Sequence, residues 1–86
     1  MFKLVLSSYT QKFLKKSDKQ LYQRLINKIK ELSVNPFPTD SKRVVGRKEK
    51  IFRIRVGDHR IEYVIYHETK EILIADIDKR ERIYHR

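Results

Sequence analysis

The sequence predicts an α+β fold: an N-terminal strand and two helices packed on one face of a twisted antiparallel β-sheet. The first half contains two stretches with apolar residues at helical spacing, and the second half contains three stretches in which apolar and polar residues alternate. The chain has 86 residues, of which 40% are hydrophobic, enough for one compact core. We therefore expect residues 1–86 to form a single domain.

The N-terminal half is expected to contain one strand followed by both helices. Residues 2–7 alternate in part and predict a strand. Residues 8–11 and 17–20 each place Gln three positions after Ser, so a serine is expected to cap the start of each helix. The second helix should end before Pro36, because proline cannot continue it. Its apolar stripe comprises Leu21, Tyr22, Leu25, Ile26, Ile29 and Leu32.

The C-terminal half is expected to form most of the sheet. Residues 39–50 are polar and basic and predict a loop with one short strand. Gly57 and Asp58 are a tight-turn signal between two alternating segments, which predicts a hairpin. Residues 69–70 turn the chain into a mainly apolar segment that is typical of a central strand. The predicted strands of this half are residues 42–45, 51–56, 59–67 and 71–78.

Composition narrows the possible functions. Lys and Arg number 21 against 11 Asp and Glu, a formal net charge of +10, which favours a polyanionic partner such as nucleic acid or an acidic protein. The absence of Cys excludes disulfides and thiol nucleophiles, and three His without Cys do not make up a structural zinc site. His59 and His67 are expected to be exposed. No apolar run has the length of a membrane span or of a signal-peptide core, so a cytoplasmic protein is expected.

The predicted hairpin gathers arginines on one face of the sheet. A two-residue turn places Arg55 opposite Arg60 and Arg53 opposite Glu62, all on the side that faces away from the helices. Like charges directly opposite one another destabilise a sheet, so this arrangement indicates a bound anion, for which the forked guanidinium group is well suited. The alternative is a solvated outer face on which the repulsion is screened. The opposite, core-facing side comprises Phe52, Ile54, Val56, Ile61 and Tyr63.

The C-terminal tail adds further polar candidates. Arg80 and Arg82 stand close to Tyr84 and His85. If the last strand lies beside residues 59–67, the tail begins at the rim of the face that carries the arginines. Tyrosine can stack on a base or transfer a proton, and histidine titrates near neutral pH. The alternative for Tyr84 is an aromatic anchor for the C-terminus.

Two segments resemble a known family. Residues 52–63, F-R-I-R-V-G-D-H-R-I-E-Y, resemble the strand pair Y-R-I-R-V-G-D-Y-R-I-x-Y of the RelE/ParE toxin superfamily, and residues 79–84, K-R-E-R-I-Y, resemble its closing H-R-x-x-I-Y. The two-helix start, the Asn-Pro turn and the basic loop that ends in Gly46 also stand where this family has them. The resemblance covers essentially the whole chain.

The resemblance implies a toxin of a type II toxin–antitoxin system, closer to the RelE branch. Such a protein is a ribosome-dependent mRNA endoribonuclease that inhibits translation by 2′-hydroxyl attack on the neighbouring phosphate, without metal or other cofactor. Its implied partners are the ribosome, mRNA and an acidic antitoxin with which it forms a hetero-oligomer. The alternatives are a ParE-like inhibitor of DNA gyrase without nuclease chemistry and a catalytically inactive RelE relative.

The resemblance also implies roles for individual residues. Arg60 matches the arginine that holds the scissile phosphate, Arg80 the one that stabilises transition-state charge, and Tyr84 the tyrosine that stacks on or orients the substrate. The implied catalytic set is Arg53, Arg55, Arg60, Arg80 and Tyr84. The implied substrate-binding set is Lys42, Arg43, Arg82 and His85.

The chain departs from the family pattern at two places. Arg53 and Arg55 stand where RelE-type enzymes often have Lys, and arginine cannot be deprotonated in a protein, so their implied role is electrostatic. Proton transfer would then fall to Tyr84, His85 or Glu62, between which the sequence does not decide. In addition, a lysine at position 79 stands where many relatives have His.

Overall fold

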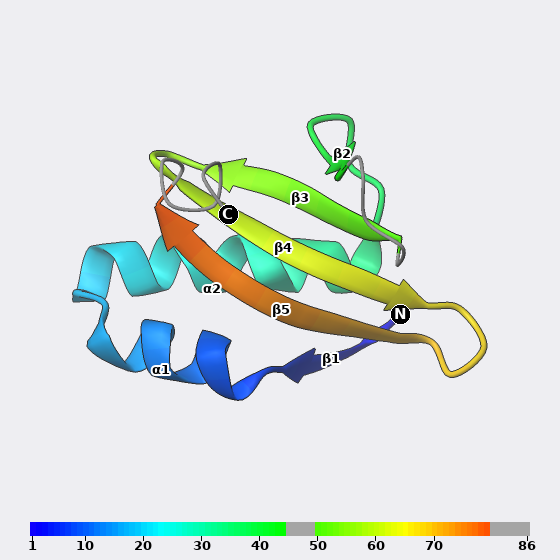
Figure 1. Cartoon of the computed structure of the whole chain (residues 1–86), viewed down its shortest axis with the longest axis horizontal. Coiled ribbons are helices and arrows are strands. Elements are labelled where there is room, and N and C mark those ends of the chain that lie inside the picture. The colour runs from blue at the N-terminus through cyan, green and yellow to red at the C-terminus, as the bar shows by residue number, and fades with distance from the viewer. Residues whose placement is uncertain (45–49, 80–86) are drawn as a thin grey trace.

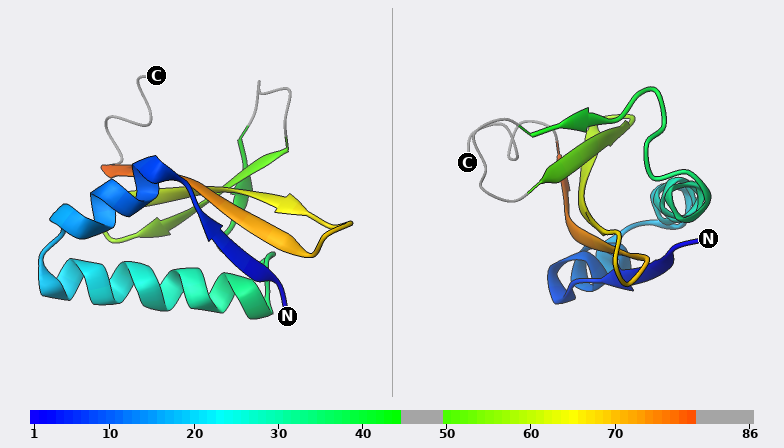
Figure 2. Two further views of the ribbon diagram at one scale, coloured as in Figure 1. Left: turned by 90° about the horizontal axis from the view of Figure 1, so that it is seen from below. Right: turned by 90° about the vertical axis from the view of Figure 1, so that its right-hand side faces the viewer.

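Two helices lie on one side of a strongly twisted five-stranded sheet (Figures 1 and 2). The computed structural model describes residues 1–44 and 50–79. The α+β class and the placement of the two helices confirm the prediction from the sequence. The elements in chain order are β1 (Lys3–Leu6), α1 (Ser8–Lys16), α2 (Lys19–Val34), β2 (Lys42–Arg43), β3 (Ile51–Val56), β4 (His59–Tyr66) and β5 (Glu71–Lys79).

The sheet is mixed, which corrects the predicted antiparallel sheet. Its strand order is β1-β5-β4-β3-β2, and β3, β4 and β5 form the expected antiparallel meander. β1, in contrast, runs parallel to β5, with Lys3 opposite Glu71 and Leu6 opposite Ile74. Because the helices lie between β1 and the other strands in the sequence, no turn dictates the direction of this pairing.

The β3–β4 hairpin has the predicted register, with Arg55 opposite Arg60 and Ile54 opposite Ile61. Gly57 in the turn has a φ of +58°, a conformation that other residues adopt at a cost. A Cβ atom at this position would also lie 2.8 Å from Nη2 of Arg24, which extends from α2 over the turn. Glycine is therefore favoured here by the positive φ of the turn, whereas the flexible end of the Arg24 side chain could move aside.

The core lies between the helices and the sheet. On α2 the predicted stripe is largely confirmed, but Tyr22 is 43% exposed, so its place in the stripe was wrong. Within the described ranges, no helix combines the length and the apolar composition needed to cross a membrane. The buried cluster comprises Leu14, Leu25, Ile29, Leu32, Ile54, Val56, Ile61, Tyr63, Ile72, Ile74 and Ile77.

Both helix caps lie one residue away from the predicted positions. Ser7 rather than Ser8 caps α1, and its Oγ accepts the backbone N–H of Thr10 at 3.1 Å. Asp18 caps α2, whereas Ser17 forms the C-cap of α1. In both places two adjacent residues are able to cap a helix, and tertiary contacts decide between them.

A β-bulge interrupts the pairing of β4 with β5. Glu62 is opposite Asp76, but the next residue of β4, Tyr63, is opposite Ile74. Ala75 is therefore an extra residue on β5. Such an insertion reverses the alternation of side chains for the rest of the strand.

The bulge determines which side chains of β5 reach each face of the sheet. Ile74 before it and Ile77 after it both enter the core, where they are 0% and 2% exposed. Asp76 and Asp78 consequently lie on the opposite face, together with the arginines of the hairpin. If β5 continued in unbroken alternation from Ile74, with Ala75 paired like its neighbours, the two carboxylates would point into the apolar core.

Hydroxyl groups at the start of α1 hold the bulge in place. The side chain of Thr10, which is fully buried, donates a hydrogen bond to the carbonyl of Ile74 at 2.8 Å. Ser7 Oγ donates to the carbonyl of Ala75 at 2.8 Å, and the backbone N–H of Ser7 donates to the Ile74 carbonyl at 3.1 Å. The first turn of α1 thus satisfies the two carbonyls at which the regular ladder is broken.

We predict that Thr10→Val lowers the free energy of unfolding by about 1–3 kcal/mol, because the isosteric change removes a buried donor to the Ile74 carbonyl. Urea denaturation measures this loss. Thr39→Val, the same change at an exposed position, is the matched control and should have little effect. Equal stability of Thr10→Val and the native protein would contradict the proposed importance of the bulge contact.

Candidate functional site

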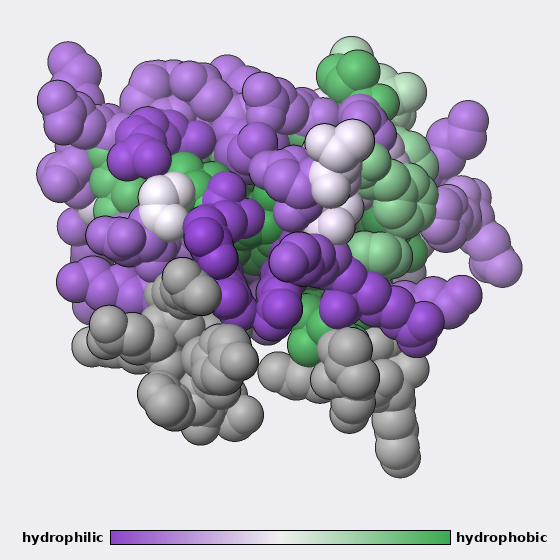
Figure 3. Space-filling model, turned by 90° about the horizontal axis from the view of Figure 1, so that it is seen from above, coloured by the Kyte–Doolittle hydropathy of each residue, from purple (hydrophilic) through white to green (hydrophobic). Residues whose placement is uncertain are grey.

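Four cationic side chains meet on the sheet face that points away from the helices. Lys42, Arg53, Arg55 and Arg60, which we call the arginine face, line one hollow of about 440 Å³ together with Asp40, Ile54 and Gly57. All four were predicted from the sequence as catalytic or substrate-binding residues. Viewed from above, the side on which β2 and β3 are uppermost in Figure 1, the surface is mainly hydrophilic (Figure 3).

The charges of this face are arranged in rows across the strands. Arg55 is opposite Arg60, which in turn is opposite Asp78 on β5. The neighbouring row runs from Lys42 on β2 through Arg53, Glu62 and Asp76. Each row therefore changes from positive charge at the β2–β3 edge to negative charge on β5.

This arrangement corrects the predicted balance of three arginines against one glutamate. Asp76 and Asp78 join Glu62 on the same face, and the sequence pattern missed them because the bulge reverses the alternation of β5. The alternative of a solvated outer face does not hold at the centre of this face, where Arg60 and Glu62 are each 6% exposed. Arg55 is exposed and Arg53 half-buried, so these two guanidinium groups are the ones that a ligand can reach.

The remaining predicted residues are not all brought together. Arg43 is opposite Phe52, so it lies on the other side of the sheet from Lys42. Two adjacent residues of one strand necessarily point to opposite faces. The predicted site residues Arg80, Arg82, Tyr84 and His85 lie outside the described residues.

The structure adds Arg24 to the basic surface. Arg24 and Lys28 of α2 line a hollow of about 370 Å³ with Arg55 and Gly57 of the hairpin. Lys28 is engaged in ion pairs with Glu31 at 3.3 Å and Asp40 at 3.6 Å. The spacing of four residues between the two cations was visible in the sequence, but their proximity to the hairpin depends on how α2 packs.

His59 was predicted to be exposed, and this was wrong. The imidazole is half-buried and packs edge-on against the ring of Phe13, with 5.6 Å between the ring centres. Burial lowers the pKa of His59 below its ordinary value of 6.5, and the positive charge of Lys79 adds to the effect. The contact depends on the packing of α1 against the sheet, for which the sequence has no local signal.

Clustered metal-binding side chains are also absent from the described part of the chain. Residues 1–44 and 50–79 contain no cluster of three or more His, Cys, Asp or Glu side chains that could hold a metal ion. The arginine face offers guanidinium groups that can stabilise negative charge, with carboxylates next to them.

Comparison with known proteins identifies the family. The family model described as the ParE toxin of the type II toxin–antitoxin system, parDE, matches residues 5–84. The chain belongs to this family. It is a toxin of the RelE/ParE superfamily, as the motifs of its sequence indicated.

Several of the similar proteins and solved structures are RelE proteins. A protein of Methanocaldococcus jannaschii with the provisional name toxin RelE1 is 37% identical over 59 residues. The match covers 65% of this chain and 64% of that protein, so the chain spans less than two thirds of the length of this relative. The RelE–RelB complex of Pyrococcus horikoshii OT3 matches with a TM-score of 0.81 and 25% identity, covering 94% of this chain and 97% of that one. The E. coli RelBE complex has a TM-score of 0.81 at 19% identity, over 95% and 100% of the chains, which shows a shared fold.

We predict that Arg55→Thr raises the free energy of unfolding at low salt by up to about 1 kcal/mol, because it removes the like charge opposite Arg60. The gain should disappear at about 1 M salt, where exposed charges are screened. Arg43→Thr, opposite an uncharged Phe, is the control for loss of one surface charge. A loss of stability in Arg55→Thr at both salt concentrations would show that Arg55 has a structural role.

We also predict that the protein loses stability as the pH falls below 6.5, because the lowered pKa of His59 means that the unfolded chain binds the proton more tightly. The contribution of His59 to the free energy of unfolding is fully present above pH 6.5 and is lost as the pH falls through the folded-state pKa. Urea denaturation between about pH 7.5 and 5 should show a smaller loss for His59→Gln than for the native protein. His67→Gln is the control, and equal pH dependence of all three proteins would contradict the prediction.

Proposed function

We propose that this toxin cuts mRNA on the ribosome by a metal-independent mechanism, with the arginine face as its catalytic surface. The observation that carries the proposal is the convergence of Lys42, Arg53, Arg55 and Arg60 on one hollow. Such a group of cations, with the exposed Arg55 opposite a second arginine, is suited to binding a phosphodiester. The 37% identity to the M. jannaschii protein supports the RelE-type assignment.

The proposed reaction needs charge stabilisation and proton transfer. The 2′-oxygen of a nucleotide forms a bond to the adjacent phosphorus and the bond from phosphorus to the 5′-oxygen breaks, leaving a 2′,3′-cyclic phosphate and a 5′-hydroxyl. Negative charge grows on the phosphoryl oxygens, where Arg53 and Arg55 are accessible to stabilise it. Arg60, buried between Arg55 and Asp78, is fixed in place and contributes positive charge from below.

A proton acceptor must take the 2′-hydroxyl proton, and the 5′-oxygen must receive one. Arginine cannot serve as the acceptor because it stays protonated. Among the described residues the candidate is Glu62, which is on the arginine face directly opposite Arg53. The resemblance to RelE adds Tyr84 and His85 as candidates, with Arg80 as a further guanidinium group and Arg82 and Arg43 as substrate-binding residues.

The proposed partners follow from charge and from the relatives. The structures from P. horikoshii and M. jannaschii are complexes of RelE with RelB. With a net charge of +10, the present toxin is suited to an acidic antitoxin that orders as it binds, as well as to the ribosome and mRNA, all in the cytoplasm. Co-expression with such an antitoxin should restore growth and yield a hetero-oligomer that copurifies.

A second candidate function is inhibition of DNA gyrase without nuclease chemistry. The description of the matching family as the ParE toxin favours it. A gyrase inhibitor does not need guanidinium groups arranged around a phosphate, so the two functions differ in their dependence on the arginine face. An inactive relative would bind antitoxin or RNA without stopping growth.

We predict that Arg53→Gln with Arg55→Gln abolishes mRNA cleavage, since the loss of one preorganised donor commonly lowers a rate by about 10²–10³. Mapping of mRNA 5′ ends after induction of the toxin measures the extent of cleavage. Lys15→Gln with Lys30→Gln removes the same charge from exposed helix positions and should leave cleavage unchanged. If growth arrest persists in the arginine variant without new mRNA ends in either protein, the gyrase-directed function is favoured.

We predict that Tyr84→Phe lowers mRNA cleavage if the hydroxyl transfers a proton, and leaves cleavage intact if the ring only stacks.

We also predict that Arg60→Lys lowers the rate of cleavage more than the affinity for RNA, because the planar guanidinium group of arginine gains most in the transition state. Arg60 is buried, so antitoxin binding serves as the folding control. Full activity of Arg60→Lys and of Tyr84→Ala would refute the assignment of these two residues.

A further inference from the structure

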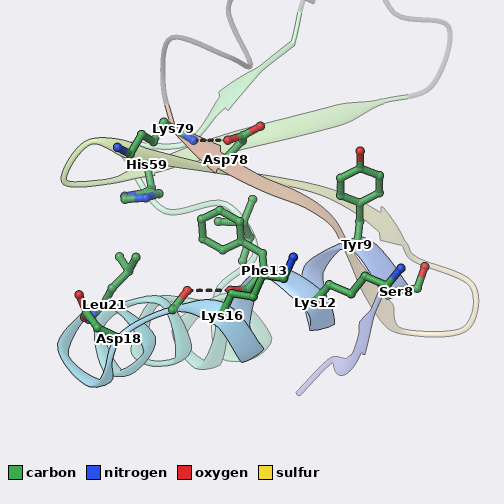
Figure 4. Close-up of a pocket in the computed structure, with 12 residues that line it drawn as sticks. Ser8, Tyr9, Lys12, Phe13, Lys16, Asp18, Leu21, His59, Asp78 and Lys79 are labelled. Atoms are coloured by element: carbon green, nitrogen blue, oxygen red, sulfur yellow. Dashed lines mark hydrogen bonds between the residues drawn. The ribbon is translucent and has the colours of Figure 1, made fainter.

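A second basic hollow lies on the other side of the sheet from the arginine face. It has a volume of about 880 Å³ and is bounded by α1, the start of α2 and the ends of β4 and β5 (Figure 4). His59 and Lys79 are directly opposite one another and alternate with Arg60 and Asp78, so they point toward the helices. We call this feature the α1 hollow. Its lining includes Tyr9, Lys12, Phe13, Lys16, His59 and Lys79.

Three lysines and two aspartates line the α1 hollow, which gives it a modest excess of positive charge. Lys12 and Lys16 are one helical turn apart on α1, and Lys79 lies across from them at the end of β5. No ion pair between described residues engages these three lysines. Each of the two aspartates that line the hollow accepts a backbone hydrogen bond: Asp18 from the N–H of Leu21 at 2.8 Å, and Asp78 from that of Lys79 at 2.7 Å.

An exposed aromatic ring stands beside the lysines. Tyr9 is 68% exposed and is one turn before Lys12 on α1, whereas Phe13 is covered by its contact with His59. Cations that track a backbone, combined with an accessible ring on which a base can stack, characterise proteins that bind single-stranded nucleic acid. An acidic peptide would use the lysines but has no need of the exposed ring.

We propose that the α1 hollow binds single-stranded RNA, with phosphates on Lys12, Lys16 and Lys79 and a base stacked on Tyr9. The choice of RNA rests on the proposed function, but the residues and the face of the sheet are different. The two surfaces meet at the end of the sheet, where the adjacent residues His59 and Arg60 point to opposite faces. A strand that passes around this end contacts both surfaces, so the α1 hollow holds RNA outside the cleavage site.

The first test measures binding of a short single-stranded 2′-O-methyl oligonucleotide, which cannot be cleaved, by fluorescence anisotropy as a function of salt. Lys12→Gln with Lys16→Gln should reduce the slope of log affinity against log salt by about 0.7 for each lysine that contacts a phosphate. Lys15→Gln with Lys19→Gln removes equal charge from exposed positions outside the hollow and should leave the slope unchanged. Equal reductions in both double variants would overturn the proposal.

The second test separates stacking from charge. Tyr9→Leu should weaken binding of the single strand roughly tenfold, within the range measured for a base stacked on an aromatic ring. Tyr22→Leu, at another exposed tyrosine that is outside the hollow, is the control and should have no effect. Unchanged affinity in Tyr9→Leu, or equally tight binding of duplex RNA, would overturn the single-strand assignment.

Two further comparisons identify the ligand class and separate this proposal from the proposed function. If polyglutamate competes as well as RNA of equal charge, the α1 hollow is a surface for an acidic protein and the proposal fails. If Lys12→Gln with Lys16→Gln weakens RNA binding although the native protein cuts no mRNA, the hollow is supported and the nuclease function is not. If mRNA cleavage depends on Arg53 and Arg55 but RNA affinity is unchanged in the variants of the α1 hollow, the proposal for the hollow fails and the nuclease function stands.

Discussion

The hydrogen bonds from Ser7 and Thr10 to the carbonyls of Ala75 and Ile74 are the contacts on which the rest of the structure depends. They join the start of α1 to the bulge of β5 and satisfy the backbone where the ladder is interrupted. The bulge directs Ile77 into the core and the two aspartates of β5 to the arginine face. The same contacts fix α1 against β5, which forms one wall of the α1 hollow.

The arginine face is polarised rather than uniformly basic. Buried carboxylates lie at the centre of the sheet and accessible cations at the β2–β3 edge, with Arg60 between them. Burial restricts the Arg60 side chain, and restricted positive charge of this kind is what charge stabilisation in a transition state requires. The charged side chains at the centre of the face are thus buried by packing, whereas those at its periphery remain available to a ligand.

The elements that depend on local signals could be predicted from the sequence, and those that depend on distant contacts could not. The turn at Gly57 determined the register of Arg55 with Arg60, so the accessible part of the site was predictable. The bulge at Ala75 has no signature of its own, and simple alternation therefore misses the face of Asp76 and Asp78. The parallel pairing of β1, the contacts of Arg24 and the burial of His59 likewise depend on how α1 and α2 pack.

The shortness of β2 has a consequence for the behaviour of the protein in concentrated solution. Among the described residues, β2 covers β3 only at Phe52 and Arg53, so the outer edge of β3 from Ile54 to Val56 has no paired strand there. Open edges of this kind are templates for strand-to-strand aggregation, which charged side chains prevent. Arg55, an exposed cation on that open stretch, is a side chain of the kind that opposes such pairing between copies of the chain, and neutralising its charge weakens this protection.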